Sequence, residues 1–185
     1  MLITLAVFDS FVAAQTVSVP VNIFGKTVGH TYTNAVIGIK LNIPKEMSVD
    51  DSQRAALSLP TGHIAGSIFG GKTLTMLPLL SASVPPVSMI ITGTKLPLHV
   101  NDTTGEAILN DALFRRPADP KAKVEKLGNN LFAYVDGKTR FNQNRSYAIV
   151  KRGYYISIVL MFQSQDDLNI MREYLADANF DWNGK

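Results

Sequence analysis

Alternating apolar and polar positions predict β-strands along much of this chain. Residues 37–43 carry isoleucine or leucine at every second position, and Pro44 ends the run. Side chains point to opposite faces at successive strand positions, so this segment has one buried face. Two further apolar runs, at residues 73–83 and 87–96, are separated by two prolines and predict adjacent strands.

The most apolar segment lies near the C-terminus and predicts a strand in the middle of a sheet. Residues 154–162 are apolar on both faces apart from one serine, and such a strand needs cover on each side. A Lys-Arg-Gly turn at 151–153 separates it from residues 146–150, which predicts a hairpin whose glycine supplies a positive φ. Residues 131–135 predict a shorter strand that ends in an Asp-Gly turn.

Three segments carry helix-start signals, in which a hydroxyl side chain precedes acidic residues that the helix dipole favours. The predicted helices are 49–59 after Ser48 with Asp50 and Asp51, 103–114 with a Thr103–Glu106 capping box, and 165–177 after Ser164 with Asp166 and Asp167. The last helix has an apolar stripe formed by Leu168, Met171 and Leu175. We therefore predict an α+β fold: a central antiparallel sheet of about five to seven strands covered by helices, an α/β/α sandwich.

The first 14 residues leave two interpretations open. They form an apolar run ending in Val12-Ala13-Ala14, and small residues at such an end are typical of a cleavable signal peptide. The run contains Asp9 and no preceding lysine or arginine, so it also fits an ordinary first β-strand. We expect the signal peptide, and hence export to the periplasm or the extracellular space. Residues 15–29 are then an extended lead-in, and residues 30–185 a single domain.

Several phrases of the sequence resemble a known group of domains. Residues 32–44 have the form Y-x-N-x-x-x-G, then alternating apolar positions, then proline. Further phrases are Leu79-Leu80-Ser81-Ala82-Ser83 before Pro85, the Arg152-Gly153-Tyr154 hairpin, and a closing helix that leads to Phe180. Together they resemble PsbP-like and Mog-like domains and exported bacterial proteins of this type, over roughly residues 30 to 182. Met47 departs from the usual opening, where related domains often place tryptophan. The resemblance implies a central antiparallel sheet between helices and a non-catalytic binding or assembly role, with no catalytic residues to carry over.

Composition narrows the chemistry that this chain offers. The 185 residues are 46% apolar and 18% charged, which is typical of a folded domain. Cysteine is absent from the sequence, which excludes disulfides, thiolate metal sites and cysteine nucleophiles. We expect no membrane span in the mature chain, because no uninterrupted apolar run reaches about 18 residues. The net charge of +3 permits an acidic partner without requiring one.

One stretch matches a nucleotide-binding motif literally. Residues 66–73 read G-x-x-x-x-G-K-[ST], the pattern of a phosphate-binding loop. Such a loop needs a buried strand before it and a helix that starts at Lys72. Here a predicted helix precedes it and Pro78 follows, so we interpret the stretch as a Gly-rich loop and predict no cofactor.

Residue types used in catalysis and metal binding are present but scattered. No two histidines have a metal-ligand spacing, and no serine lies in a nucleophile-elbow motif. Helix capping accounts for the paired aspartates. The residues considered are His30, His63, His99, Ser67, Asp50-Asp51 and Asp166-Asp167. We assign none of them as a catalytic, cofactor-binding or metal-binding residue.

Basic residues gather in two stretches with interleaved aromatic residues, a pattern that fits nucleic-acid binding. The cations are Arg115, Arg116, Lys121, Lys123, Lys126, Lys138, Arg140, Arg145, Lys151 and Arg152, and the aromatic residues are Tyr134, Phe141, Tyr147 and Tyr154. We favour a different interpretation, in which residues 115–126 are solvated loop and the other cations are sheet-edge residues that discourage edge pairing. N-glycosylation sequons begin at Asn101 and Asn144, and they matter only in a host that glycosylates exported proteins.

Two functions follow from these observations. The first is an exported, non-catalytic binding or assembly module with an unidentified protein partner and no nucleic acid. The second is a hydrolase whose site is assembled from dispersed residues, such as His63 or His99 with a nearby carboxylate. The sequence leaves the oligomeric state open.

Overall fold

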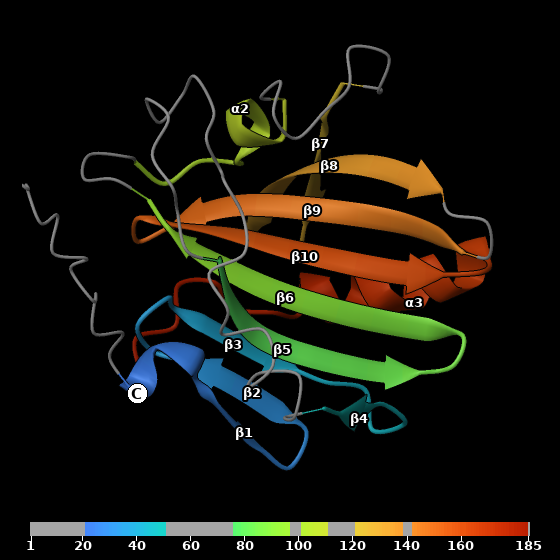
Figure 1. Ribbon diagram of the computed structural model, residues 1–185, viewed down its shortest axis with the longest axis horizontal. Coiled ribbons are helices and arrows are strands. Elements are labelled where there is room, and N and C mark those ends of the chain that lie inside the picture. Colours follow the sequence, from blue (N-terminus) through green and yellow to red (C-terminus); the bar gives the residue numbers. More distant parts are fainter. Residues whose placement is uncertain (1–20, 51–75, 97–100, 111–120, 139–141, 185) are drawn as a thin grey trace, which may run out of the picture.

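A computed structural model describes residues 21–50, 76–96, 101–110, 121–138 and 142–184 of the chain. Within these ranges, ten strands form two antiparallel sheets, one of seven strands and one of three (Figure 1). The strands of the larger sheet follow the order β4-β5-β6-β10-β9-β8-β7. Their bounds are β4 Ser48–Val49, β5 Met76–Val84, β6 Val87–Lys95, β7 Lys123–Leu127, β8 Asn130–Lys138, β9 Gln143–Lys151 and β10 Tyr154–Phe162.

Strand β10 lies at the centre of the larger sheet, as its sequence predicts. It pairs with β6 on one side and β9 on the other, so that Ile158 lies opposite Ile91 and Tyr147. The β9–β10 hairpin closes at Arg152 and Gly153, whose φ angles are 51° and 72°. Strands β5 and β6 also form a hairpin, which closes at Pro85 and Pro86, so the predicted hairpin and the predicted pair of adjacent strands are both confirmed.

The smaller sheet contains β1 Lys26–Val28, β2 Thr31–Asn34 and β3 Ile39–Asn42, and a 3₁₀-helix at Val21–Phe24 precedes it. The turn between β2 and β3 explains the Y-x-N-x-x-x-G phrase. The side-chain oxygen of Asn34 accepts hydrogen bonds from the N–H groups of Val36 and Ile37, both at 3.1 Å. Its amide nitrogen donates to the carbonyl oxygen of Ile23 at 2.6 Å and to the Tyr32 hydroxyl at 3.1 Å. The phrase therefore encodes a buried polar turn.

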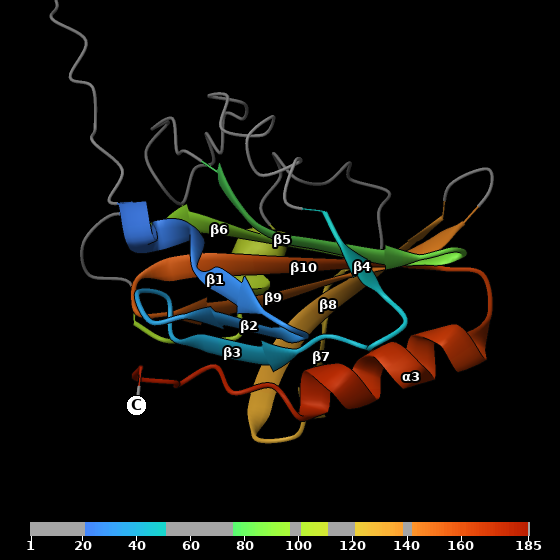
Figure 2. The same ribbon diagram turned by 90° about the horizontal axis from the view of Figure 1, so that it is seen from below.

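The two faces of the larger sheet are covered differently. The smaller sheet and helix α3, Gln165–Ala176, lie on one face (Figure 2). They bury the main core there, which includes Tyr32, Ile39, Leu79, Ile91, Phe132, Tyr147, Ile158, Leu168 and Met171. A smaller cluster around Tyr155 and Val150 lies on the opposite face under the four-residue helix α2, Glu106–Leu109. Neighbouring residues on β9 alternate between the two clusters, as strand geometry requires.

The predicted fold class is wrong, although the antiparallel sheet is present. The described part of the chain is mostly β, with 54% strand and 15% helix, and is not an α/β/α sandwich. One face of the larger sheet, which was predicted to be covered by helices, is covered by the smaller sheet together with α3. Helix 165–177 is confirmed by α3, whereas the predicted helix 103–114 is represented by α2 alone within the described residues. Of the predicted helix 49–59, Val49 belongs to β4, and residues 51–59 lie outside the described part.

Three local predictions were also wrong. The Thr103–Glu106 capping box is absent from α2, because the backbone of Thr103 pairs with Val150 and Gly105 occupies the N-cap. Asp136-Gly137 forms no turn, because β8 continues through both residues and ends at Lys138. Residues 123–126, predicted as loop, form most of β7 at the sheet edge.

Candidate binding groove

One side of helix α3 faces open space. Ser164 and Asp167 begin the helix with a reciprocal capping box, which confirms the predicted cap. The stripe of Leu168, Met171 and Leu175 is buried against the sheets. Asp167, Ile170 and Tyr174 follow one another at helical spacing beside that stripe and line a surface hollow together with Met171. The Ile170 residue is 53% exposed, an unusual position for a large aliphatic side chain.

Two loops from distant parts of the sequence form the opposite wall. The β5–β6 turn contributes Val84, Pro85, Pro86 and Val87. The segment after β3 contributes Pro44, Glu46 and Met47, and it is shaped by a turn in which the Met47 N–H donates to the Pro44 carbonyl oxygen at 3.0 Å. This turn buries the Met47 side chain, which is 3% exposed, and leaves Glu46 at the surface.

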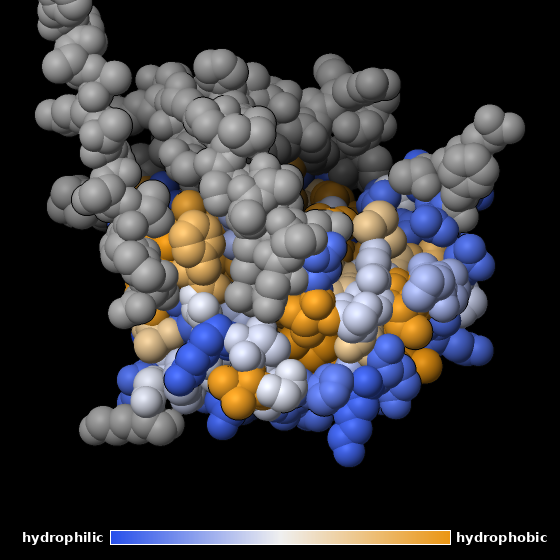
Figure 3. All heavy atoms as spheres, turned by 60° about the horizontal axis from the view of Figure 1, so that its bottom comes forward, coloured by the Kyte–Doolittle hydropathy of each residue, from blue (hydrophilic) through white to orange (hydrophobic). Residues whose placement is uncertain are grey.

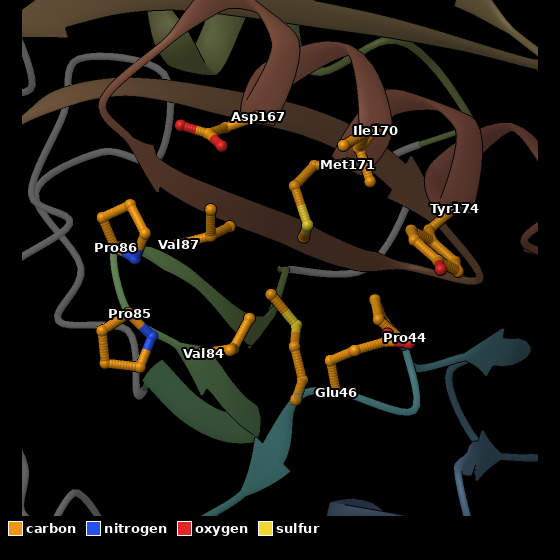
Figure 4. Close-up of a pocket in the computed structure, with 11 residues that line it drawn as sticks. Pro44, Glu46, Val84, Pro85, Pro86, Val87, Asp167, Ile170, Met171 and Tyr174 are labelled. Carbon is orange, nitrogen blue, oxygen red and sulfur yellow. The ribbon is translucent and has the colours of Figure 1, made fainter.

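The hollow between these walls, here called the α3 groove, has a volume of about 360 Å³. Figure 4 shows Ile170, Met171 and Tyr174 of α3 on one side, and Val84 and Pro44 on the other. Figure 3 shows apolar side chains that reach the surface among hydrophilic ones on this side of the molecule. A concave, mostly apolar surface of this size with a few polar groups is typical of a binding site.

Two further hollows adjoin the α3 groove. The first has a volume of about 400 Å³, is lined by His30, Thr31, Asn42 and Lys45 among others, and shares Pro44, Glu46 and Tyr174 with the groove. The second has a volume of about 360 Å³, is lined by Ser83, Ser88, Asn142 and Gln163, and shares the two prolines and Val87. The concave surface is therefore elongated, with an apolar centre and polar ends.

The charged groups of the groove are carboxylates. Glu46 and Asp167 line it, and its described lining includes neither lysine nor arginine. Hydrogen bonds from Ser164, with the backbone N–H of Gln163 in addition, lower the pKa of the Asp167 carboxyl, which is therefore ionised at neutral pH. Glu46 has no ion-pair or hydrogen-bond partner among the described residues. The rim of the groove therefore carries negative charge.

A second cluster of charged groups lies where α3 packs on the edge of the larger sheet. Glu125 of β7 accepts hydrogen bonds from the Tyr147 hydroxyl, from Arg145 Nη1 at 3.5 Å and from Arg172 Nη2 of α3 at 3.0 Å. Arg145 also forms a two-point contact with Asp136, at 2.6 and 3.1 Å. Burial, reinforced by the hydrogen bond to Glu125, raises the pKa of the Tyr147 phenol above its ordinary value. This cluster joins α3 to three strands, although the buried Arg172 Nε has no hydrogen-bond partner among the described residues. We interpret the cluster as structural.

Several groups considered for nucleic-acid binding are engaged in internal contacts. Arg145 lies 4.3 Å from the Tyr134 ring centre in addition to its ion pairs, and the Tyr147 ring is fully buried. The Arg152 guanidinium donates to the carbonyl oxygens of Ala35, Asp181 and Trp182 at 2.8, 3.3 and 2.8 Å. Lys151 forms an ion pair with Asp181 at 2.9 Å. Lys151 and Arg152 thus hold the C-terminal segment against the sheets, and all three cations present few free donors to phosphates.

Most of the other residues considered from sequence lie outside the described residues. These are the Gly66–Thr73 motif with Ser67 and Lys72, His63, His99, Asp51, Arg115, Arg116, Arg140 and Phe141. His30 lies in the described part and lines the hollow beside the groove, without a second histidine in its lining. Within the described ranges, no three histidine or acidic residues come together in a way that fits a metal ion.

Sequence reasoning missed the α3 groove. Its walls come from three segments far apart in the chain, and periodicity does not predict which segments meet. A local signal was nevertheless present, because Ile170 interrupts the polar side of a helix whose apolar stripe was already complete.

The described helices include none that is long and apolar enough to span a membrane. No protein-family model, curated protein sequence or solved structure matches the chain.

Proposed function

We propose that this protein is a non-catalytic binding module that holds an apolar segment of a partner protein in the α3 groove. The observation that carries the proposal is the exposed Ile170 side chain, 53% accessible, at the wall of a largely apolar hollow. The resemblance to PsbP-like and Mog-like domains also implies a binding or assembly role, but the structure lacks the α/β/α architecture that this resemblance implies, so the proposal rests on the groove. Export, which the apolar run ending at Ala14 favours, is part of the same proposal.

The energetic reason is the removal of apolar surface from water. Full burial of an isoleucine side chain contributes about 1.5–3 kcal/mol, so covering the exposed half of Ile170 contributes about 1 kcal/mol, or roughly fivefold in affinity. The half-buried Val84, Val87 and Tyr174 add further apolar area. A partner segment that covers all of these side chains gains enough binding free energy from apolar burial to bind reversibly.

Selection from a library of random linear peptides tests the proposal. The immobilised wild-type protein is the target, and binders are then compared on Ile170→Gln, which removes the aliphatic surface without changing the charge. Leu131→Gln is the matched control, since Leu131 is 49% exposed but belongs to β8, away from the groove.

We expect selected peptides to bind Ile170→Gln roughly fivefold more weakly than wild type, and Leu131→Gln with unchanged affinity. Failure to select any binder, or selected peptides that bind both variants equally well, would contradict the proposal.

A further inference from the structure

The shape of the concave surface indicates an extended ligand. The α3 groove shares three lining residues with each of the two adjoining hollows, so a single extended chain can contact all three. The centre is apolar, and both ends offer polar side chains. A polypeptide segment with apolar side chains in its middle and polar residues beside them matches this arrangement.

The charged side chains around the groove determine which of these segments bind favourably. Glu46 stands at the boundary between the groove and the hollow that contains His30, and it has no charged partner within the described part of the chain. Asp167 lies across from it on α3, and exposed Asp166 and Glu173 lie on the same helix. Lys45 is the nearby cation of the adjoining hollow. The cation of α3, Arg172, is engaged by Glu125 at 3.0 Å. The described charged groups around the groove are therefore predominantly negative.

We infer that the ligand of the α3 groove is a segment of a partner protein in which apolar side chains are flanked by at least one lysine or arginine. The inference rests on the proposed function and specifies the chemistry of its partner. The apolar side chains cover Ile170, Val84 and Val87, while the flanking cation lies near Glu46. A purely apolar segment leaves the Glu46 carboxylate unpaired, and an acidic segment is repelled by it.

The closing experiment uses peptides selected on the wild-type protein and measures their affinity for charge variants of it. Glu46→Gln removes the unpaired charge and Glu46→Lys reverses it, whereas Glu106→Lys, on the exposed first turn of α2, is the control for a change in overall charge. Each peptide is also synthesised with its lysine and arginine residues replaced by glutamine.

We expect the selected peptides to be enriched in lysine or arginine beside apolar residues. Their affinity falls roughly threefold with Glu46→Gln and further with Glu46→Lys, as expected for partly exposed charge pairs. Glutamine-substituted peptides bind more weakly to wild type and equally to both Glu46 variants. Glu106→Lys leaves every affinity unchanged.

The two ideas fail in different ways. Peptides that depend on Ile170 but lack basic residues, or that bind the Glu46 variants as tightly as wild type, overturn the inference and leave the proposed function in place. Peptides whose binding is indifferent to Ile170→Gln overturn both.

Discussion

Replacement of Asn34 by alanine provides a quantitative test of the buried turn between β2 and β3. Asn34 is 1% exposed, and its side chain makes four hydrogen bonds: two from backbone N–H groups, one to a backbone carbonyl and one to the Tyr32 hydroxyl. Alanine removes all four. Tyr32 keeps its bond to the Phe24 carbonyl oxygen at 3.0 Å, so its hydroxyl remains satisfied.

The magnitude follows from the groups that lose their partner. The buried Ile37 N–H and the Ile23 carbonyl become unsatisfied, and each such group costs about 1–3 kcal/mol. The Val36 N–H is half-buried and retains access to water, so we assign it no cost. The expected loss is therefore about 2–6 kcal/mol of the free energy of unfolding, a large part of the 5–15 kcal/mol that is typical of a domain.

Urea unfolding followed by circular dichroism measures this loss. Asn42→Ala is the matched control, because Asn42 is exposed on the same hairpin and makes a single exposed hydrogen bond with Thr31 at 3.1 Å. We expect the control to lose less than about 0.5 kcal/mol. The urea midpoint of Asn34→Ala should fall with an unchanged slope. A loss below about 1 kcal/mol, or one equal to that of the control, would refute the reasoning.

Three further predictions concern other contacts of the fold. Glu125→Gln leaves Arg145 and Arg172 without their shared carboxylate, so we expect thermal unfolding to show a loss of about 2 kcal/mol in the free energy of unfolding. The control is Asp136→Asn, at a carboxylate that is 48% exposed, which should lower the free energy of unfolding by less than about 1 kcal/mol. Gly128→Ala places a Cβ against the Ala176 carbonyl oxygen at φ 57°, whereas Gly29→Ala, at φ 58°, meets nothing within 4 Å; chemical unfolding should therefore show a clearly larger loss at Gly128. The pKa of Asp167 is lowered in the folded protein, so the carboxylate adds stability above the unfolded-state pKa of about 3.9, and this stability is lost as pH falls through the folded pKa. Asp167→Asn should therefore lower the urea midpoint at neutral pH. On acidification, the urea midpoint of this variant should fall less steeply than that of wild type.

Local sequence signals predicted the elements whose formation depends on neighbouring residues. The alternation along β5 and β6, the Pro85-Pro86 turn, the Arg152-Gly153 turn and the capping box at Ser164 are all present in the structure. Each is determined within a few residues by backbone geometry, so a single sequence is sufficient to indicate it.

The elements that were missed depend on contacts between distant residues. The charges of β7 suggested a solvated loop, but Glu125 is 16% exposed because Arg145 and Arg172 neutralise it from β9 and α3. The N-terminal part of the predicted helix at 103–114 was lost because Thr103 pairs instead with Val150, 47 residues further along the chain. The α3 groove was missed for the same reason, since Glu46, Val87 and Ile170 meet only in the folded chain.

Chemical-shift mapping of the isotopically labelled protein with a selected peptide tests the central claim most directly, because it reports where the peptide binds. If the α3 groove is the binding site, the largest shift changes will lie at Glu46, Met47, Val87, Ile170 and Tyr174. Changes centred instead on the exposed Val124 and Leu131 at the β7–β8 edge, with the groove resonances unmoved, would contradict the account.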